Sequence, residues 1–311
     1  MKAIEEFTET VQRIKDAAKN KEEEERWVRL EKGMPVTFEE EDGQQLLYPR
    51  KCRVQGSPLI TTALFRCSRR RERLDNVEVA AQGKWQIRVD GETFTQHDEL
   101  VFMELVNRAN WAQSRTVRFS MRSFMREIGL TAKGGGGAMR VEESLLRLAS
   151  TTVELKDKTG RDDWGIKGPL AAFAMWKKNK ETGSKEFIVE LNKPWFWMLS
   201  EEGYTIINWG THRQLSVGLH TWMHRFALRH QTATGPKREG LANLLAYTGM
   251  KSSLRSFRLQ LKGAMTKLAE LGVVESWSIQ GRGKSAYLEF TKPLTEKQKA
   301  RILAAASKTA S

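Results

Sequence analysis

Two hydrophobic periods divide the chain after residue 56 into strands and helices. A period of two, typical of a strand with one buried face, runs through SPLITTALFRCS, through VEVAAQGKWQIRV with a turn at Gln82-Gly83, and through TTVELKD and the segments up to Glu190. A period near 3.6, typical of a helix with one apolar face, runs through TQHDELVFMELVNRANW, MRSFMREIGL and the residues from the GGGG run to Ala149. The pattern predicts a mixed chain of helices and strands.

The first three helices and the strands after them have the order of a winged helix-turn-helix. Thr95 can cap the first helix, whose apolar face would consist of Leu100, Met103, Leu105 and Val106. The second helix follows a short strand, TVRFS, and ends at Gly129. A Gly-rich turn joins it to the third helix, and a β-hairpin follows. We therefore expect one winged helix-turn-helix domain over residues 56–200.

Residues 201–311 repeat this order, although the two halves share no recognisable residue-level repeat. We expect helices at about Arg213–Gln231, Arg238–Tyr247 and Ser252–Leu271, followed by a hairpin of VVESWSIQ and AYLEF. The predicted fold class is therefore α+β, with two tandem winged helix-turn-helix domains. The segment PWFWML at their junction is expected to pack between domains or in a core rather than stack on bases.

The turn of the second hairpin, GRGKS, looks at first like the end of a nucleotide-binding loop. Such a loop requires a glycine five positions before its Gly-Lys-Ser and a helix directly after it. Ser278 occupies the earlier position, and the alternating strand AYLEF follows instead of a helix. We therefore interpret the segment as the tip of a wing that carries Arg282 and Lys284.

The charge distribution makes a polyanion the first partner to consider. The formal net charge is +14, and residues 201–311 hold 17 Lys and Arg against 7 Asp and Glu. Residues 1–50 instead hold 9 basic and 13 acidic residues. Residues 1–55 are therefore predicted to be a charged arm with a solvated helix from about Ile4 to Leu30, either a disordered or weakly helical tail or a docking arm for another protein.

Cysteine usage and hydropathy predict a cytoplasmic protein with no membrane partner. Cys52 and Cys67 provide no disulfide framework, which indicates a reducing compartment. The longest wholly apolar run, PLAAFAMW, is shorter than the ~18 residues that a membrane-spanning helix needs. The acidic N-terminus lacks the basic and apolar regions of a signal peptide.

The last helix of a helix-turn-helix unit lies in the major groove, so its outer face should carry donors for bases and phosphates. In the helix predicted from Ser252, one side is apolar, with Leu254, Phe257, Leu261, Met265 and Leu268. A different side carries three cations within about 60° of one another, namely Arg255, Arg258 and Lys262. Ser252 and Ser253 begin the helix, where a cap hydroxyl and the helix dipole favour a phosphate.

The equivalent helix of the first domain carries a thinner polar stripe. Its inward positions would be Val141, Leu145, Leu148 and Ala149, and its outward positions would be Arg140, Ser144 and Arg147. The neighbouring Glu142 and Glu143 weaken this stripe as a phosphate-binding face. For both helices the plain alternative is a solvated face in a basic protein.

Catalytic patterns are poor, and we expect neither an enzyme nor a cofactor. His220 and His224 stand four apart in a predicted helix, which could seat zinc. The segment HTWMH, however, has no acidic residue beside its first histidine, as a zinc protease would have. Its Trp222 and Met223 indicate ordinary helix packing, so no metal site is predicted.

The chain resembles the TrfA-type plasmid replication initiators. The resemblance rests on SPLITTALFRCSR, on GKWQIRVDGETFTQHDELVFMELV, and on LTAKGGGG followed by VEESLLRLASTTVEL, and it covers residues 55–200 better than residues 201–300. It implies a bacterial cytoplasmic protein that binds direct repeats, called iterons, at a plasmid origin. It further implies that the protein opens adjacent AT-rich DNA and recruits the host replicative helicase and initiator.

The same resemblance assigns roles to the predicted residues. The C-terminal domain would read the repeat with Arg255, Arg258 and Lys262, while Arg140, Arg147 and the wing would contact phosphates. The N-terminal domain would also mediate an inactive dimer, for which we expect the hairpin VEVAAQGKWQIRV to pair with a second copy. A sliding clamp is a further partner of such families, and Gln214–Leu219 is a partial match to its binding motif.

Two other classes of function stay open on the sequence. A winged-helix transcriptional repressor, which could regulate its own gene, would read inverted half-sites because of its two-fold symmetry. A non-specific RNA-binding or architectural protein would need only the charge. The orientation of repeats near the gene separates the repressor from the initiator, and a preferred site above competitor DNA excludes the third class.

Overall fold

The structure is a computed structural model that describes residues 36–38, 45–47, 52–68, 70–112, 114–130, 136–159, 165–178, 185–195, 198, 203–230, 232 and 235–294. The helix expected from Ile4 to Leu30 lies outside these residues. The GGGG run lies only partly among them. Two short strands, β1 (Val36–Phe38) and β2 (Gln45–Leu47), form an antiparallel pair of their own.

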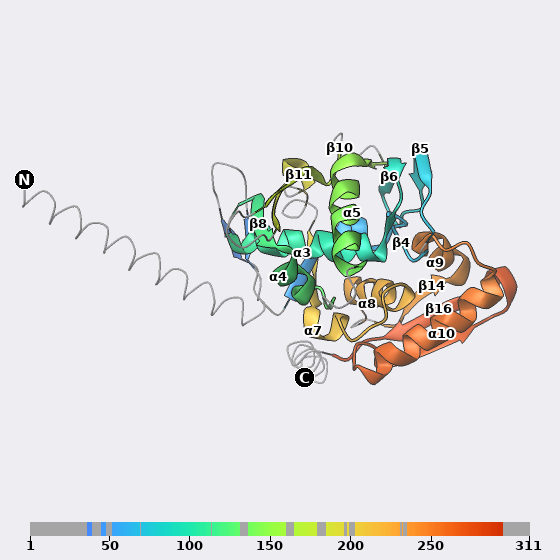
Figure 1. The fold of residues 1–311 in the computed structure, drawn as a ribbon. Coiled ribbons are helices and arrows are strands. Elements are labelled where there is room, and N and C mark those ends of the chain that lie inside the picture. The colour runs from blue at the N-terminus through green and yellow to red at the C-terminus, as the bar shows by residue number, and fades with distance from the viewer. Residues whose placement is uncertain are drawn as a thin grey trace, which may run out of the picture.

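Two antiparallel sheets surround a central helix, α3 (Gln96–Ala112), in the first unit (Figure 1). The four-stranded sheet has the order β10-β9-β6-β5, and its members are β5 (Arg73–Val79), β6 (Trp85–Glu92), β9 (Thr152–Asp157) and β10 (Gly165–Gly168). The three-stranded sheet has the order β11-β12-β8, and its members are β8 (Thr116–Ser120), β11 (Ala171–Lys178) and β12 (Lys185–Leu191). Two more helices of this unit are α4 (Met121–Glu127) and α5 (Gly136–Ser150).

The period-two segments form these strands because alternate side chains enter the core. Trp85, Ile87 and Val89 of β6 are buried, and so are Val153 and Leu155 of β9, which pairs with it. The VEVAAQGKWQIRV hairpin is confirmed as the antiparallel pair β5–β6. The β5 strand lies at the edge of its sheet, so its proposed pairing with a second copy stays a prediction.

The first helix is buried on more sides than its sequence pattern predicts. The expected apolar residues of α3 are buried, but so are Asp98, Glu99 and Glu104. Each of these acids pairs with an arginine of another element, namely Arg147 of α5, Arg225 of the second unit and Arg53 of β3 (Cys52–Gly56). The predicted apolar face is therefore confirmed, but the buried acids were not predicted, because sequence periodicity cannot show partners that neutralise acids inside a core.

The expected strand SPLITTALFRCS is also wrong over most of its length. Its first residues form a short helix, α2 (Ser57–Ile60), with Pro58 in the first turn. Proline suits that position because the missing N–H would have no partner there in any case. Only β4 (Phe65–Arg66) extends, and it pairs in parallel with β7 (Phe94–Thr95).

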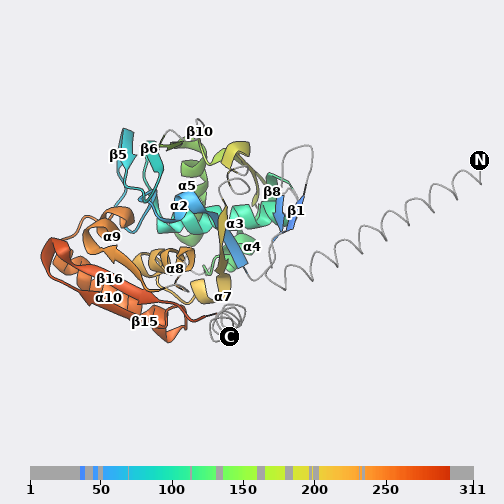
Figure 2. The ribbon, with the colours of Figure 1, turned by 180° about the vertical axis from the view of Figure 1, so that it is seen from behind.

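The second unit packs three helices against a three-stranded sheet. The helices are α8 (Leu219–Arg229), α9 (Leu241–Thr248) and α10 (Leu254–Glu270), and the sheet β14-β16-β15 consists of β14 (Lys237–Gly240), β15 (Ser276–Gln280) and β16 (Tyr287–Thr291). Figure 2 shows this sheet and α10 together at one side of the molecule. The predicted hairpin is confirmed, with Gln280 opposite Tyr287.

Two helices of this unit begin later than predicted. Residues 238–240, expected to be helical, belong to the strand β14, because they pair with β16 as part of a third strand. The helix expected at Arg213–Gln231 begins at Leu219, since Gly218 has a φ of 133°, which a helix cannot contain. The preceding residues form a separate short helix, α7 (Trp209–His212), and turns.

The two units have separate hydrophobic cores, and the first core includes residues beyond the predicted boundary at residue 200. The strand β13 (Tyr204–Asn208) pairs with β3, and Ile207 and Trp209 belong to the first core. The second core begins at Leu215. Trp195 and Met198 of the PWFWML segment are buried in the first core, so the expected core packing is confirmed for these two residues.

No helix in the described part of the chain is long and apolar enough to cross a membrane. Cys52 and Cys67 are free thiols.

Candidate nucleic-acid interface

The helix α10 has a buried side and an outer side, as its sequence predicts. Its core side chains are fully buried, namely Phe257, Leu261, Ala264, Met265 and Leu268. Ser253 is the N-cap, and its hydroxyl accepts a hydrogen bond from the backbone N–H of Ser256 at 3.2 Å. Arg255 and Lys262 are exposed on the outer side. The helix therefore holds two cations away from the core on a firmly packed element.

The wing is a tight glycine turn that carries two more exposed cations. Gly281 has a φ of 75°, and a Cβ atom there would lie 2.9 Å from the carbonyl oxygen of Ser285. Only glycine suits this position, because a side chain would meet backbone and the positive φ is unfavourable for other residues. Arg282 and Lys284 lie on either side of Gly283 at the exposed tip.

Arg258 joins the helix to the wing. Its Nη1 donates to the carbonyl of Gly281 at 2.9 Å, and its Nη2 donates to the carbonyl of Ile279 at 3.2 Å. The side chain is half-buried. The predicted base contact by Arg258 would require the release of these bonds, so in this structure the residue fixes the wing against α10.

Four cations of the helix and the wing have no acidic partner in the part of the chain that the structure describes. Within the described residues, no carboxylate lies within ion-pair distance of Arg255, Lys262, Arg282 or Lys284. Neighbouring cations are neutralised, as Lys267 is by Glu270 at 2.9 Å. Unpaired positive charges on an outer helix and an adjacent wing can bind phosphates without first breaking an internal ion pair. We call these four residues with Arg258 the α10–wing surface.

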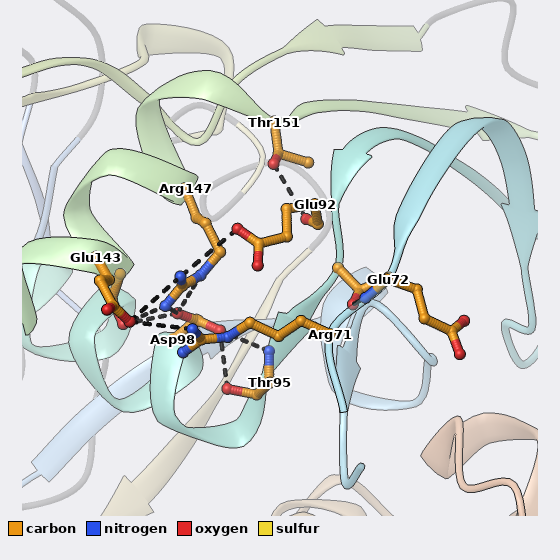
Figure 3. Close-up of polar contacts among 10 residues, drawn as sticks. Arg71, Glu72, Glu92, Thr95, Asp98, Glu143, Arg147 and Thr151 are labelled. Atoms are coloured by element: carbon orange, nitrogen blue, oxygen red, sulfur yellow. Dashed lines mark hydrogen bonds and ion pairs between the residues drawn. The ribbon is translucent and has the colours of Figure 1, made fainter. Parts of the chain in front are cut away.

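Two of the DNA-contact residues predicted in the first unit are buried. Ser144 is 0% exposed and Arg147 is 5% exposed, so the prediction that both point outward is wrong. Both contact Asp98 of α3. Arg147 Nη2 donates to Asp98 Oδ1 at 2.8 Å (Figure 3). The Ser144 hydroxyl donates to the same atom at 2.6 Å. Polar residues that face a buried carboxylate have the same spacing along a helix as polar residues that face solvent. The spacing of Ser144 and Arg147 therefore could not show that they are buried.

Asp98 is the centre of this buried cluster. Its Oδ2 accepts bonds from the backbone N–H and the hydroxyl of Thr95 at 2.7 and 2.8 Å. Burial alone would raise the pKa of Asp98, but the charge of Arg147 and the donors of Ser144 and Thr95 outweigh it, so the pKa is lowered. Thr95 thus precedes α3 as predicted, although its hydroxyl donates to Asp98 instead of capping a backbone N–H.

Among the described residues, one cation on the outer face of α5 has no acidic partner. Glu143 pairs with Arg71 at 3.0 Å, and Glu142 pairs with Lys185 at 3.2 Å. Arg140 is exposed and has no acidic partner among the described residues. It lines a surface hollow between the two units together with Arg66 and Arg71. Of the three residues predicted on this face, only Arg140 remains available for a phosphate.

A buried polar network fixes the two units to each other. Arg225 of α8 is 1% exposed and pairs with Glu99 of α3. Its Nη1 and Nη2 also donate to the amide oxygens of Gln55 and Gln96, each at 2.9 Å. Burial raises the pKa of Glu99 to about 7, although the charge of Arg225 opposes this. Sequence reasoning missed this network, because no local pattern links positions so far apart in the chain.

Of the two histidines in HTWMH, His224 packs inside the second unit as predicted, whereas His220 is only half-buried. His224 is 1% exposed, and its Nδ1 lies 2.9 Å from Nδ1 of His212. Burial, followed by the charge of Arg225, lowers the pKa of His224 to about 4. In the part of the chain that the structure describes, no three His, Cys, Asp or Glu residues gather as a metal site would require.

The partial clamp-binding match lies before α8 except for its last residue, Leu219, which begins that helix. Leu215 and Leu219 are buried in the second core, whereas Gln214 and Val217 are exposed. Two of its apolar side chains are therefore already used by the fold.

Comparison with solved structures finds the fold in two crystal structures of domains 2 and 3 of RctB. One, of selenomethionine derivatives, matches with a TM-score of 0.52 and 12% identity over 77% of this chain and 98% of the other. The second, RctB-155-483, has the same TM-score and identity over 76% of this chain and 97% of the other. No protein-family model and no curated protein sequence matches the chain. The likeness shows a shared mixed helix and strand fold.

Proposed function

We propose that the chain is a DNA-binding replication initiator that recognises repeats at a plasmid origin through the α10–wing surface. The observation that carries this proposal is the set of four unpaired, exposed cations on an outer helix and the wing beside it. The resemblance of residues 55–200 to TrfA-type initiators supports the choice of an initiator, and so does the fold shared with domains 2 and 3 of RctB.

Both units are proposed to be winged helix-turn-helix domains. In the second unit α8, α9 and α10 precede the β15–β16 hairpin, and in the first α3, α4 and α5 precede β9 and β10. On this proposal α10 enters the major groove, where Arg255 and Lys262 reach base edges or flanking phosphates. Arg282 and Lys284 hold the phosphate backbone beside the groove, and Arg140 supplies a phosphate contact from the first unit.

The remaining steps of the proposal follow from this family resemblance. The bound protein would open adjacent AT-rich DNA and recruit the host helicase, and its first unit would form an inactive dimer. The buried Arg225 network supports a fixed spacing between the units. A protein with such a spacing would place both units on one face of a repeat as a single body.

A salt series on two kinds of DNA tests the proposal. Binding sites are selected from a random duplex library with the full chain, and the dissociation constant is then measured for the selected site and for random DNA. The double variant Arg282→Ala with Lys284→Ala should weaken both about equally and lower the slope of log K against log salt by about 2, since each neutralised phosphate releases nearly one counterion.

Arg255→Ala is the matched variant on the helix. If Arg255 reaches a base edge, it should weaken the selected site by about 1 to 3 kcal/mol and random DNA far less. Failure to enrich any site would exclude sequence recognition and leave a non-specific binder. Enrichment of inverted half-sites rather than direct repeats would favour a repressor instead.

A further inference from the structure

The outer face of α10 carries an apolar side chain that the fold does not use. Leu259 is 65% exposed, the largest exposed fraction among the large apolar side chains that the structure describes. At 100° per residue it lies about 40° from Arg255 and about 60° from Lys262 on the same face. The core of the second unit lies on the opposite side of the helix, where Phe257 and Leu261 are fully buried.

Neither packing nor helix formation explains a leucine at this position. A polar residue such as Gln, Lys or Arg forms helices about as well, and it would not expose an apolar side chain to water. The exposed neighbours Ser256, Gln260 and Lys262 are polar, so Leu259 does not extend into a wider apolar patch. A protein partner recognised by a hydrophobic surface would need a larger contiguous area than one side chain.

Leu259 is a single apolar side chain beside the cations Arg255 and Lys262. A ligand that complements this surface would be a polyanion that carries an isolated apolar group. Duplex DNA has this chemistry, because phosphates line the groove and thymine displays its 5-methyl group in the major groove. We propose that Leu259 contacts a pyrimidine 5-methyl group and makes α10 selective for thymine at one position of its site. This inference rests on the proposed function, in which α10 lies in the major groove.

Replacement of single thymines by deoxyuridine tests the contact, because only the methyl group is removed. The full chain is assayed on the duplex selected from a random library, with each thymine replaced in turn. At one position or two adjacent positions, deoxyuridine should weaken the wild-type protein about 3- to 5-fold, as expected for the burial of one methyl group. In Leu259→Ala the same replacement should change binding less than about 2-fold, because the side chain that contacts the methyl group is already removed.

Two matched variants separate this contact from general weakening. Lys262→Ala should bind less tightly but keep the full difference between thymine and deoxyuridine. Leu259→Met should also keep most of the difference, since it retains an apolar side chain of similar volume. Urea unfolding of Leu259→Ala should match the wild type, because the residue is exposed.

The outcomes separate failure of this inference from failure of the proposed function. If a site is enriched but no thymine shows a methyl effect, or if Leu259→Ala keeps the effect, the contact is refuted and the proposed function stands. If no site is enriched, both fail. Placing 5-methylcytosine at the sensitive position should restore binding only if the methyl group alone is recognised; without restoration, thymine itself is the ligand.

Discussion

Replacement of Arg147 by alanine separates a structural arginine from a DNA contact. Arg147 donates to Asp98 Oδ1 through Nε at 3.1 Å and Nη2 at 2.8 Å, and both residues are buried. The carboxylate is 0% exposed, and its other donors, Thr95 and Ser144, are neutral. Arg147→Ala would thus leave a charged carboxylate inside the core without its counter-charge.

The expected cost is large because solvent cannot replace the lost partner. Removal of one member of a buried ion pair typically costs about 3 to 5 kcal/mol. Arg140→Ala, about two helical turns earlier, removes an exposed cation and should change the free energy of unfolding by less than about 0.5 kcal/mol. Adding Asp98→Asn to Arg147→Ala should recover about 1 kcal/mol or more, since a neutral amide needs no counter-charge.

Urea unfolding and DNA titrations over a salt series measure the two effects separately. Arg147→Ala should lower the unfolding midpoint strongly and leave the salt slope of DNA binding unchanged under conditions where it is folded. Arg140→Ala should keep the midpoint and lower the slope by about 1. An Arg147→Ala protein as stable as the wild type, with a slope reduced by 1, would refute the structural role and restore the phosphate contact.

Two further predictions concern the wing and the buried histidines. Arg258→Ala should speed amide hydrogen exchange in residues 279–286 about fivefold, because the loss of its two hydrogen bonds to wing carbonyls should destabilise the wing by about 1 kcal/mol. Arg255→Ala should leave this exchange unchanged. Equal exchange in the two variants would contradict the role of Arg258 in fixing the wing against α10. The pKa of His224 is about 4 in the folded protein and about 6.5 in the unfolded chain. As the pH falls below about 6.5, the unfolded chain takes up a proton that the folded protein does not, so the free energy of unfolding should decrease, by about 2 kcal/mol at pH 5. Urea unfolding at pH 7 and 5 should show a smaller loss for His224→Gln, and an equal loss would exclude His224 as a source.

The sequence by itself determined the helix and the hairpin that form the α10–wing surface. The 3.6-residue period from Leu254 to Leu268 and the period-two strands around GRGKS predicted α10 and its hairpin, and the structure has both. In each of these elements one face packs on a single core and the other face meets solvent. The polarity of a side chain therefore shows directly which face of its helix or strand it occupies. For the same reason Arg255, Lys262, Arg282 and Lys284 are exposed as predicted.

Only the tertiary structure decided which polar residues are inside. Arg140 and Arg147 share a helix face in the sequence, yet one is exposed and the other is paired with Asp98. Arg225 and Glu99 come from different units and meet in a buried network. A buried charge is stable only with a partner, and the partner here is distant in sequence, so periodicity cannot distinguish it from a solvated charge. The same limit hid β14, which is a strand because β16 lies beside it.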